Sequence, residues 1–374
     1  MLGSLGAETC DSTTHGDRDF YCVRYRGHCM DGRYEPVESR DETTVFPYHD
    51  LTPPTTADVV RARNTVDRHL PETPLVRSES LSAALDADVY LKREDTLPTG
   101  AFKVRGGVNF VASLPEEFRE RGLVTASSGN HGLSIAWAGR AFDVHVTIAV
   151  PKEANGGKVA AMEGLGAEVV NHGPDYDAAR EHIEQRAIET GERYVHSGNE
   201  PKLLAGVGTA GLEVLEELPD IDRLYCPVGG GTAAVGYCLT VGALTDADVV
   251  GVQSEAAPAM HRAYHEDTLE PHDRMETDAE GVATRVPFAL TMDLLRDGLA
   301  DFELVSEGAI RDAVARLFVD ERIVMEGACG TGVAAALAAG DDLAGETVVI
   351  PISGRNIDRE KFAAILAEYD GAGN

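Results

Sequence analysis

The chain has 374 residues and 43% of them are hydrophobic, so it can bury a large core and is not a disordered protein. Its 63 acidic and 33 basic residues give a net charge of −30, which argues against a nucleic-acid-binding surface and against binding to anionic membranes. Only 6 of the 33 basic residues are lysine. This composition favours a halophilic protein, kept soluble in concentrated salt, over an ordinary acidic cytosolic protein.

Cysteine usage and hydropathy point to the cytoplasm. Six cysteines in a chain of this length do not make a disulfide scaffold, and no apolar run approaches the length of a membrane span. The first ten residues lack the basic and apolar regions of a signal peptide. We therefore expect a cytoplasmic protein that contacts neither membrane nor nucleic acid.

Residues 1–48 differ from the rest of the chain. They are polar, show little periodicity and contain Cys10, Cys22 and Cys29. We interpret this segment as an appended surface arm. A metal clip is the alternative, but the cysteine spacing matches no standard zinc module, because there is no Cys-x-x-Cys pair.

From residue 49 onward, short β-branched runs alternate with helical stretches. The expected strands are residues 89–91, 123–126, 145–150, 168–170, 224–228, 249–252 and 347–352. The expected helices are residues 132–142, 156–165, 176–190, 206–217, 232–244, 307–320 and 329–340. Strands separated by helices of this length predict an α/β fold with a mostly parallel sheet.

Lys103 is the first candidate for chemistry. It follows a Pro-Thr-Gly turn and an aromatic residue, and it precedes Arg-Gly-Gly, where a helix could begin. A lysine forms a Schiff base with an aldehyde once burial or a nearby cation lowers its pKa. On its position alone, Lys103 fits a surface lysine in a salt bridge better than a catalytic lysine.

Three strand-to-helix turns strengthen the case for a ligand site. They are Ser-Ser-Gly-Asn-His at 127–131, Gly-Gly-Gly-Thr at 229–232 and Ser-Gly-Arg-Asn at 353–356. The first suits a carboxylate and the second a phosphate, because glycine-rich turns and helix starts present free N–H groups to anions. Ligands of open α/β sheets bind at the carboxyl ends of strands, where all three turns fall. A lysine with a phosphate cradle points to pyridoxal phosphate.

Taken together, these motifs resemble the fold-type II pyridoxal-phosphate enzymes, and most closely the threonine/serine dehydratase and serine racemase branch. The resemblance covers residues 70–360 and rests on four motifs in the family's order, beginning with Pro-Thr-Gly-Ala-Phe-Lys-Val-Arg-Gly at 98–106. It implies a fold like that of the tryptophan synthase β-subunit. It also implies a large cofactor-binding lobe of residues 49–121 and 200–374, a small lobe of residues 122–199, and a homodimer.

The resemblance also implies a role for each motif. Lys103 would carry the cofactor through a Schiff base and then act as the base on the substrate α-carbon, and Ser128 could exchange a proton on the opposite face. The cofactor-binding residues would be Phe102, Lys103, Asn130, Gly229, Gly230, Gly231, Thr232 and Ser353. The substrate carboxylate would be held by Ser127, Ser128, Gly129, Asn130 and His131.

The implied activity is the elimination of water and ammonia from threonine, serine or a related β-hydroxy amino acid, giving a 2-oxo acid. Threonine synthase or racemase activity on the same fold is the first alternative, and a non-catalytic pyridoxal-phosphate-binding protein is the second. Retention of Lys103, Asn130 and Ser353 weighs against the second alternative.

Three further positions qualify the resemblance. Gln253 and Ala259 stand where racemase-like members carry the acidic ligands of a divalent cation, so we predict no metal site. Glu326 matches a family position near the active site, but an acid that stabilises a helix N-terminus would look the same in the sequence.

Overall fold

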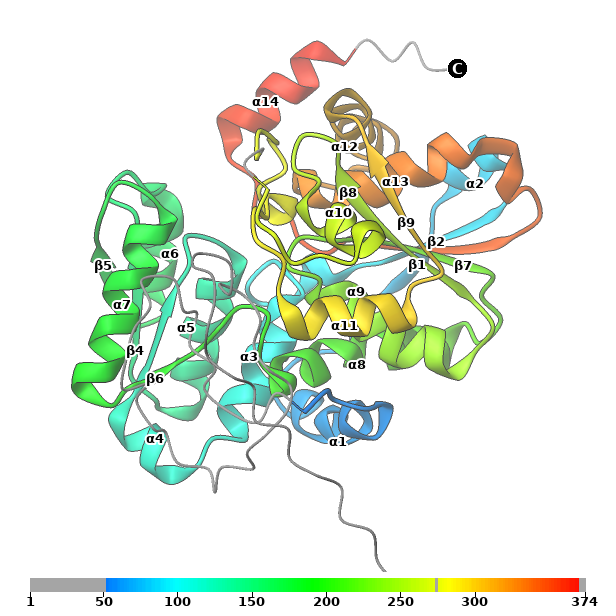
Figure 1. The fold of residues 1–374 in the computed structure, drawn as a ribbon. Helices are drawn as coiled ribbons and strands as arrows, with labels where there is room; N and C mark the ends of the chain where they lie inside the picture. Colours follow the sequence, from blue (N-terminus) through cyan, green and yellow to red (C-terminus); the bar gives the residue numbers. More distant parts are fainter. Residues whose placement is uncertain (1–51, 273–274, 370–374) are drawn as a thin grey trace, which may run out of the picture.

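The computed structural model describes residues 52–272 and 275–369, so the predicted arm at 1–48 lies outside the described residues. The described chain forms two β-sheets, each with helices on both faces (Figure 1). The predicted α/β class with mostly parallel sheets is confirmed. No described helix is both long and apolar enough to cross a bilayer.

The larger sheet has six strands in the order β1-β2-β10-β7-β8-β9. Its strands are β1 (Leu75–Arg77), β2 (Asp88–Lys92), β7 (Arg223–Pro227), β8 (Asp248–Ser254), β9 (Asp301–Val305) and β10 (Thr347–Pro351). Only β1 runs antiparallel to its neighbour. The carboxyl ends of β2, β10 and β7 therefore lie side by side, which brings together the segments that follow these strands.

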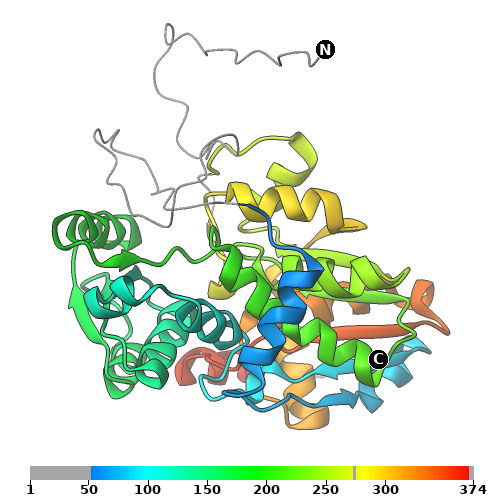
Figure 2. The same cartoon turned by 90° about the horizontal axis from the view of Figure 1, so that it is seen from below.

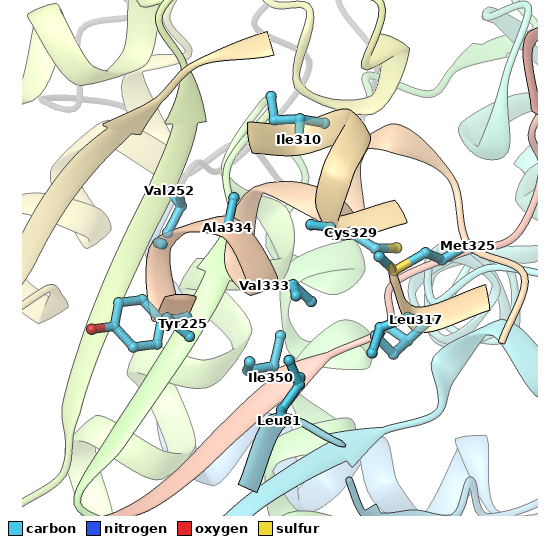
Figure 3. Packing of buried hydrophobic residues seen from close by; sticks show 14 of the residues in the cluster. Leu81, Tyr225, Val252, Ile310, Leu317, Met325, Cys329, Val333, Ala334 and Ile350 are labelled. Carbon is cyan, nitrogen blue, oxygen red and sulfur yellow. The ribbon is translucent and has the colours of Figure 1, made fainter. Parts of the chain in front are cut away.

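Successive residues of the central strands face opposite sides of the larger sheet, so both faces are apolar. On one face Tyr225, Val252 and Ile350 pack against α12 and α13 (Figure 3). This face is covered by α2 (Glu79–Leu85), α12 (Glu307–Glu321), α13 (Gly327–Ala339) and α14 (Arg359–Glu368). The other is covered by α8 (Pro201–Glu217), α9 (Thr232–Tyr237), α10 (Ala259–Glu266) and α11 (Ala289–Gly298).

The smaller sheet has four parallel strands in the order β5-β4-β3-β6. They are β3 (Leu123–Ala126), β4 (Val146–Val150), β5 (Glu168–Asn171) and β6 (Arg193–Tyr194). One face packs against α3 (Lys103–Ala112), α5 (Asn130–Phe142) and α6 (Gly156–Gly164), and the other against α7 (Tyr176–Thr190). Helix α4 (Glu116–Arg121) precedes β3. Helix α1 (Thr56–Val66) lies along α8 (Figure 2).

The helices begin where the sequence supplies capping side chains. Thr55 and Asp58 form a capping box at α1, and the side chain of Asp175 accepts a hydrogen bond from the backbone of Ala178 at the start of α7. Gly191 ends α7 with a φ of 73°, a left-handed conformation that glycine adopts without strain.

All seven expected strands are present, but the sequence prediction omitted three strands and several helices. The omitted elements are β1, β6, β9, α1, α2, α3, α4, α10, α11 and α14. The expected helix at 232–244 is interrupted, because α9 passes into a π-helical turn at Cys238–Gly242. Three short 3₁₀ turns complete the described structure, at Glu94–Thr96, Glu280–Val282 and Gly340–Leu343.

A buried ionic network fixes helix α3 against the larger sheet. The Arg105 guanidinium is fully buried and donates to both oxygens of Glu94 and to both oxygens of Glu213, at 2.6–2.8 Å. Lys92, also fully buried, lies 2.8 Å from Glu213. Two cations thus neutralise two carboxylates. Although burial opposes ionisation of Glu213, hydrogen bonds from Arg105 lower its pKa to about 2.

We predict that Arg105→Leu lowers the free energy of unfolding by about 3–5 kcal/mol, because the change leaves a buried carboxylate uncompensated. Urea denaturation measures this cost. Arg262→Leu is the matched control, because it breaks an exposed pair with Glu266 on α10 and should change stability little. Equal effects of the two substitutions would show that the buried network is not a source of stability.

Candidate active site

A cavity of about 550 Å³ lies between the two sheets. It is lined by segments that follow strands of both sheets: residues 127–131 after β3, His196 and Ser197 after β6, Gly230 after β7 and Asn356 after β10. Strand carboxyl ends are the usual ligand-binding edge of parallel sheets. The volume falls within the range of small-molecule sites.

The structure brings the predicted site residues together around this cavity. Lining the cavity are Lys103, Ser127, Ser128, Gly129, Asn130, His131 and Gly230. Phe102, Gly229, Gly231 and Thr232 are sequence neighbours or contact partners of the lining residues. Ser353 lies behind them, where its carbonyl oxygen accepts a hydrogen bond from the Phe102 backbone.

Lys103 is the first residue of α3 and reaches toward the glycine turn. Gly100, with a φ of 71°, turns the chain just before the helix. The backbone N–H of Phe102 donates to the carbonyl oxygen of Ser353 at 2.9 Å, which ties the start of α3 to the segment after β10. The Lys103 Nζ donates to Thr232 Oγ1 at 3.2 Å and lies 5.0 Å from the centre of the Phe102 ring.

Burial changes the ionisation of Lys103. Loss of solvent lowers the pKa of this amine from 10.5 to about 8, and the negative charge of Glu326 only partly opposes the shift. A sizeable fraction of the amine is therefore uncharged near neutral pH, which is the form that attacks a carbonyl carbon. The neighbouring cation considered from the sequence, Arg105, faces the buried carboxylates of Glu94 and Glu213 instead.

The glycine turn after β7 has no room for side chains. A Cβ on Gly229 would lie 2.1 Å from the carbonyl oxygen of Gly281, and one on Gly230 would lie 2.5 Å from the Phe288 ring. Gly231 has a φ of 86°, in the left-handed region. Such a turn offers backbone N–H groups to an anion. Because the Lys103 amine contacts Thr232, an amine that can react with a carbonyl group lies next to a turn that can bind a phosphate. This combination fits a phosphorylated aldehyde.

Ser353 is buried and has an uncharged partner. Its hydroxyl lies 3.3 Å from the Cys329 thiol, which also donates to the carbonyl oxygen of Gly354. Burial raises the pKa of the Cys329 thiol to about 12, so the thiol stays protonated. A pyridine nitrogen bound at Ser353 would therefore face a neutral hydroxyl group, because neither Ser353 nor Cys329 carries a charge.

The turn after β3 leads directly into α5. The backbone N–H of Gly129 donates to the Ser127 hydroxyl at 3.2 Å. The His131 ring is buried, and its Nε2 lies 3.0 Å from the Thr125 hydroxyl oxygen and 3.2 Å from the Val195 carbonyl oxygen. Burial lowers the pKa of His131 to about 3. The side chain is thus neutral at physiological pH.

Asn356 lines the cavity, but the sequence interpretation gave it no role of its own. Its Nδ2 donates to Asn130 Oδ1 at 2.7 Å and to the Thr99 carbonyl oxygen at 2.9 Å. Asn130 in turn donates to Glu326. The motif at 353–356 contains Asn356, so the residue was visible in the sequence. Its hydrogen bond with Asn130, 226 positions away, was not.

The predicted absence of a metal site is not tested by this structure. In the part of the chain that is described, no group of three or more His, Cys, Asp or Glu side chains could hold a metal ion. Gln253, which stands at an expected ligand position, is buried; its Oε1 accepts a hydrogen bond from the His261 backbone at 3.1 Å.

An α/β fold with a reactive lysine, a glycine turn and a buried serine around one cavity defines an enzyme that works through pyridoxal phosphate. The family model described as pyridoxal-phosphate dependent enzyme matches residues 66–354, and the chain belongs to this family. The resemblance inferred from the motifs is thereby confirmed, and so is the cofactor.

Individual relatives cover most of this chain. It is 37% identical over 313 residues to an L-threonine ammonia-lyase of Thermotoga maritima, covering 83% of this chain and 78% of the relative. A processed threonine deaminase of Solanum lycopersicum superposes with a TM-score of 0.80 at 27% identity, covering 83% and 92%. Serine racemase from Dictyostelium discoideum superposes with a TM-score of 0.77 at 29% identity, covering 82% and 99%.

We predict that the Lys103 amine of the cofactor-free chain becomes reactive as the pH rises through about 8, because burial lowers its pKa and deprotonation exposes the nitrogen lone pair. Mass spectrometry of the Lys103 peptide after timed exposure to an amine-reactive reagent measures the midpoint. The same chain in denaturant is the control and should titrate near pH ~10.4, as free lysine does. A native midpoint at the denatured value would show that the site does not perturb this amine.

Proposed function

We propose that this enzyme eliminates water and ammonia from threonine, serine or a related β-hydroxy amino acid such as 3-hydroxyaspartate, releasing a 2-oxo acid. The observation that carries the proposal is the Lys103 amine beside the glycine turn, with a pKa of about 8, in a cavity shared with the turn at 127–131. The similarity to the L-threonine ammonia-lyase supports the choice of reaction.

Residues from several elements would hold pyridoxal phosphate. The backbone of Gly229, Gly230 and Gly231 with Thr232 would bind the phosphate, Asn130 the 3-hydroxyl, and Ser353 the ring nitrogen, while Phe102 lies against the ring. When bound, the cofactor supplies an electron sink for the α-carbon of the substrate. Because Ser353 is neutral, it leaves the ring nitrogen largely unprotonated. This weaker sink favours rapid loss of a β-substituent.

Lys103 performs the proton transfer at the substrate. With pyridoxal phosphate and substrate bound, the free Nζ of Lys103 would take the hydrogen from the α-carbon. A pKa near 8 suits this task, because a base works best when its pKa lies close to the working pH.

The turn at 127–131 orients the substrate. Ser127, Ser128 and the backbone N–H groups of Gly129, Asn130 and His131 hold the α-carboxylate. His131 contributes its backbone here, because its ring is neutral and its Nε2 contacts Thr125 and Val195. Orientation of this kind would make the α-hydrogen face the Lys103 nitrogen.

We propose that the two sheets are the centres of two lobes, and that residues 122–199, which contain all four strands of the smaller sheet, make up the small lobe. Contacts join them across the cavity: Arg285 lies 2.7 Å from Asp177, and Lys158 lies 2.5 Å from Glu280. We propose that these ion pairs hold the lobes together and limit the access of water to the reaction.

Racemisation is the competing reaction, because serine racemase shares the fold. Ser128 lines the cavity together with Lys103 and would return the proton on the opposite face of the α-carbon. Threonine synthesis and simple cofactor binding without turnover remain the other outcomes of the assay below.

The proposed cellular setting of the enzyme rests on its composition and cysteines, and the proposed oligomeric state rests on the family resemblance. We propose a homodimer in the cytoplasm of a cell with concentrated internal salt, where screening weakens repulsion among carboxylates at a net charge of −30. The described cysteines, Cys226, Cys238 and Cys329, are buried free thiols, as expected in a reducing compartment. Sedimentation tests the homodimer, and unfolding measured across a potassium chloride series tests the adaptation to salt.

We predict that the purified holoenzyme releases ammonia and 2-oxobutanoate from threonine, and that Lys103→Ala lowers the rate at least ~10²–10⁴-fold, because the base is lost. Coupled assays of ammonia and 2-oxo acid measure the rate. Chiral analysis of the remaining amino acid detects racemisation, and phosphate release from O-phosphohomoserine detects threonine synthase activity. Lys202→Ala, which changes a lysine outside the cavity lining, is the control. Full activity of Lys103→Ala would contradict the mechanism.

A further inference from the structure

The side chain of Asn130 is held from two sides by residues distant in sequence. Its Nδ2 donates to both carboxylate oxygens of Glu326, at 3.0 Å each, and its Oδ1 accepts from Asn356 Nδ2 at 2.7 Å. We call Asn130, Glu326 and Asn356 the amide clamp. Asn130 belongs to α5 beside the smaller sheet, Glu326 directly precedes α13, and Asn356 follows β10, so three separate segments meet at one amide.

The hydrogen bonds of the amide clamp allow only one orientation of the Asn130 amide. At one end, the Thr99 carbonyl can only accept, so the Asn356 group that contacts both Thr99 and Asn130 must be the NH₂. At the other end, the Asn130 NH₂ then faces the Glu326 carboxyl oxygens, which accept its hydrogen bond. A flipped Asn130 would set oxygen against carboxylate and NH₂ against NH₂, losing both contacts.

Glu326 is committed to this contact. It occupies the N-cap position of α13, but its side chain makes no capping hydrogen bond and contacts the Asn130 amide instead. The surrounding backbone is shaped around the carboxylate: a Cβ on Gly354 would lie 2.9–3.0 Å from its atoms. Burial raises the pKa of Glu326, and the hydrogen bond from Asn130 partly offsets that effect.

We propose that Glu326 and Asn356 are positioning residues that fix the Asn130 amide with one N–H group free to donate into the cavity. A nitrogen equidistant from both Glu326 oxygens directs one hydrogen between them, which leaves its second hydrogen for a ligand. This step rests on the proposed function. The acceptor of that hydrogen would be the 3-oxygen of pyridoxal phosphate, to which Asn130 would then always donate.

The role acts through a single oxygen of the cofactor, so an analogue lacking that oxygen isolates it. Apo-protein is titrated with pyridoxal phosphate and, separately, with its 3-deoxy analogue. For Glu326→Leu, which removes the acceptor of the Asn130 hydrogen bond, we expect the Kd of pyridoxal phosphate to rise about tenfold, the loss of one hydrogen bond. The Kd of the 3-deoxy analogue should change by no more than about twofold, because the analogue lacks the oxygen that accepts the Asn130 hydrogen bond.

Asn356→Asp is a second, independent variant. It sets a carboxylate oxygen against Asn130 Oδ1, so it opposes the same orientation from the other side of the amide clamp. We expect the same selective loss of affinity for pyridoxal phosphate over the 3-deoxy analogue. Because the two positions lie on different segments, misfolding of one variant leaves the other to decide.

The absorption spectrum of the bound cofactor gives a readout that a structural role would not move. A donor at the 3-oxygen stabilises its anionic, long-wavelength form, so Glu326→Leu should lower the share of the long-wavelength band and shift the pH at which the bands interconvert. Asp278→Leu is the matched control: it removes another cavity-lining carboxylate, one paired with Arg311, and should leave the band ratio unchanged.

The outcomes separate this proposal from the proposed function. Equal losses of affinity for both cofactors, or unchanged spectra in both variants, would overturn the amide clamp while wild-type turnover of threonine continued. A wild-type protein that binds pyridoxal phosphate but turns over no β-hydroxy amino acid would overturn the proposed reaction, and the affinity comparison would still test the amide clamp.

Discussion

The arrangement of the active site depends on a fully buried salt bridge. Arg105 lies two residues after Lys103, and its guanidinium is held by two carboxylates, Glu94 just beyond β2 and Glu213 on α8. Burying such charges is favourable only with full pairing, which the near-ideal bidentate geometry provides. The start of α3 is therefore tied to the larger sheet, and the adjacent Lys103 amine is directed toward the glycine turn.

The order of strands in the larger sheet then assembles the cavity. Strands β2, β10 and β7 are neighbours in space although they are far apart in the chain. The segments that follow them carry Lys103, Ser353 and the glycine turn at 229–232, so parallel pairing alone brings the three together. The smaller sheet contributes the turn at 127–131, and α3 packs against that sheet while carrying the lysine.

Sequence patterns predicted the elements that are buried on both faces. The strands β4 and β7 appeared as continuous apolar or β-branched runs, which need no partner to be noticed. Strand β9 was missed because it is half-exposed and carries Asp301 and Glu303, and β6 was missed because it has only two residues. Helix α3 was obscured by Gly106 and Gly107, which lower helix propensity but allow close packing against α8 and α5.

The candidate site could be anticipated only in part. Motifs placed the lysine and the three turns at strand ends, because glycine and small residues mark such turns locally. The partnership of Asn130 with Glu326 spans 196 positions and with Asn356 spans 226, so it arises from tertiary packing and has no local signal. The same holds for the pKa of Lys103, which depends on burial between the two sheets.

The central claim is that the Lys103 amine carries the cofactor. Reduction of the holoenzyme with borohydride, followed by proteolysis and mass spectrometry, locates the lysine that bears the pyridoxyl group. The structure predicts a single labelled peptide that contains Lys103, and loss of the label in Lys103→Ala. A label on any of the other five lysines, or no label in protein that shows the bound-cofactor absorbance, would contradict the account.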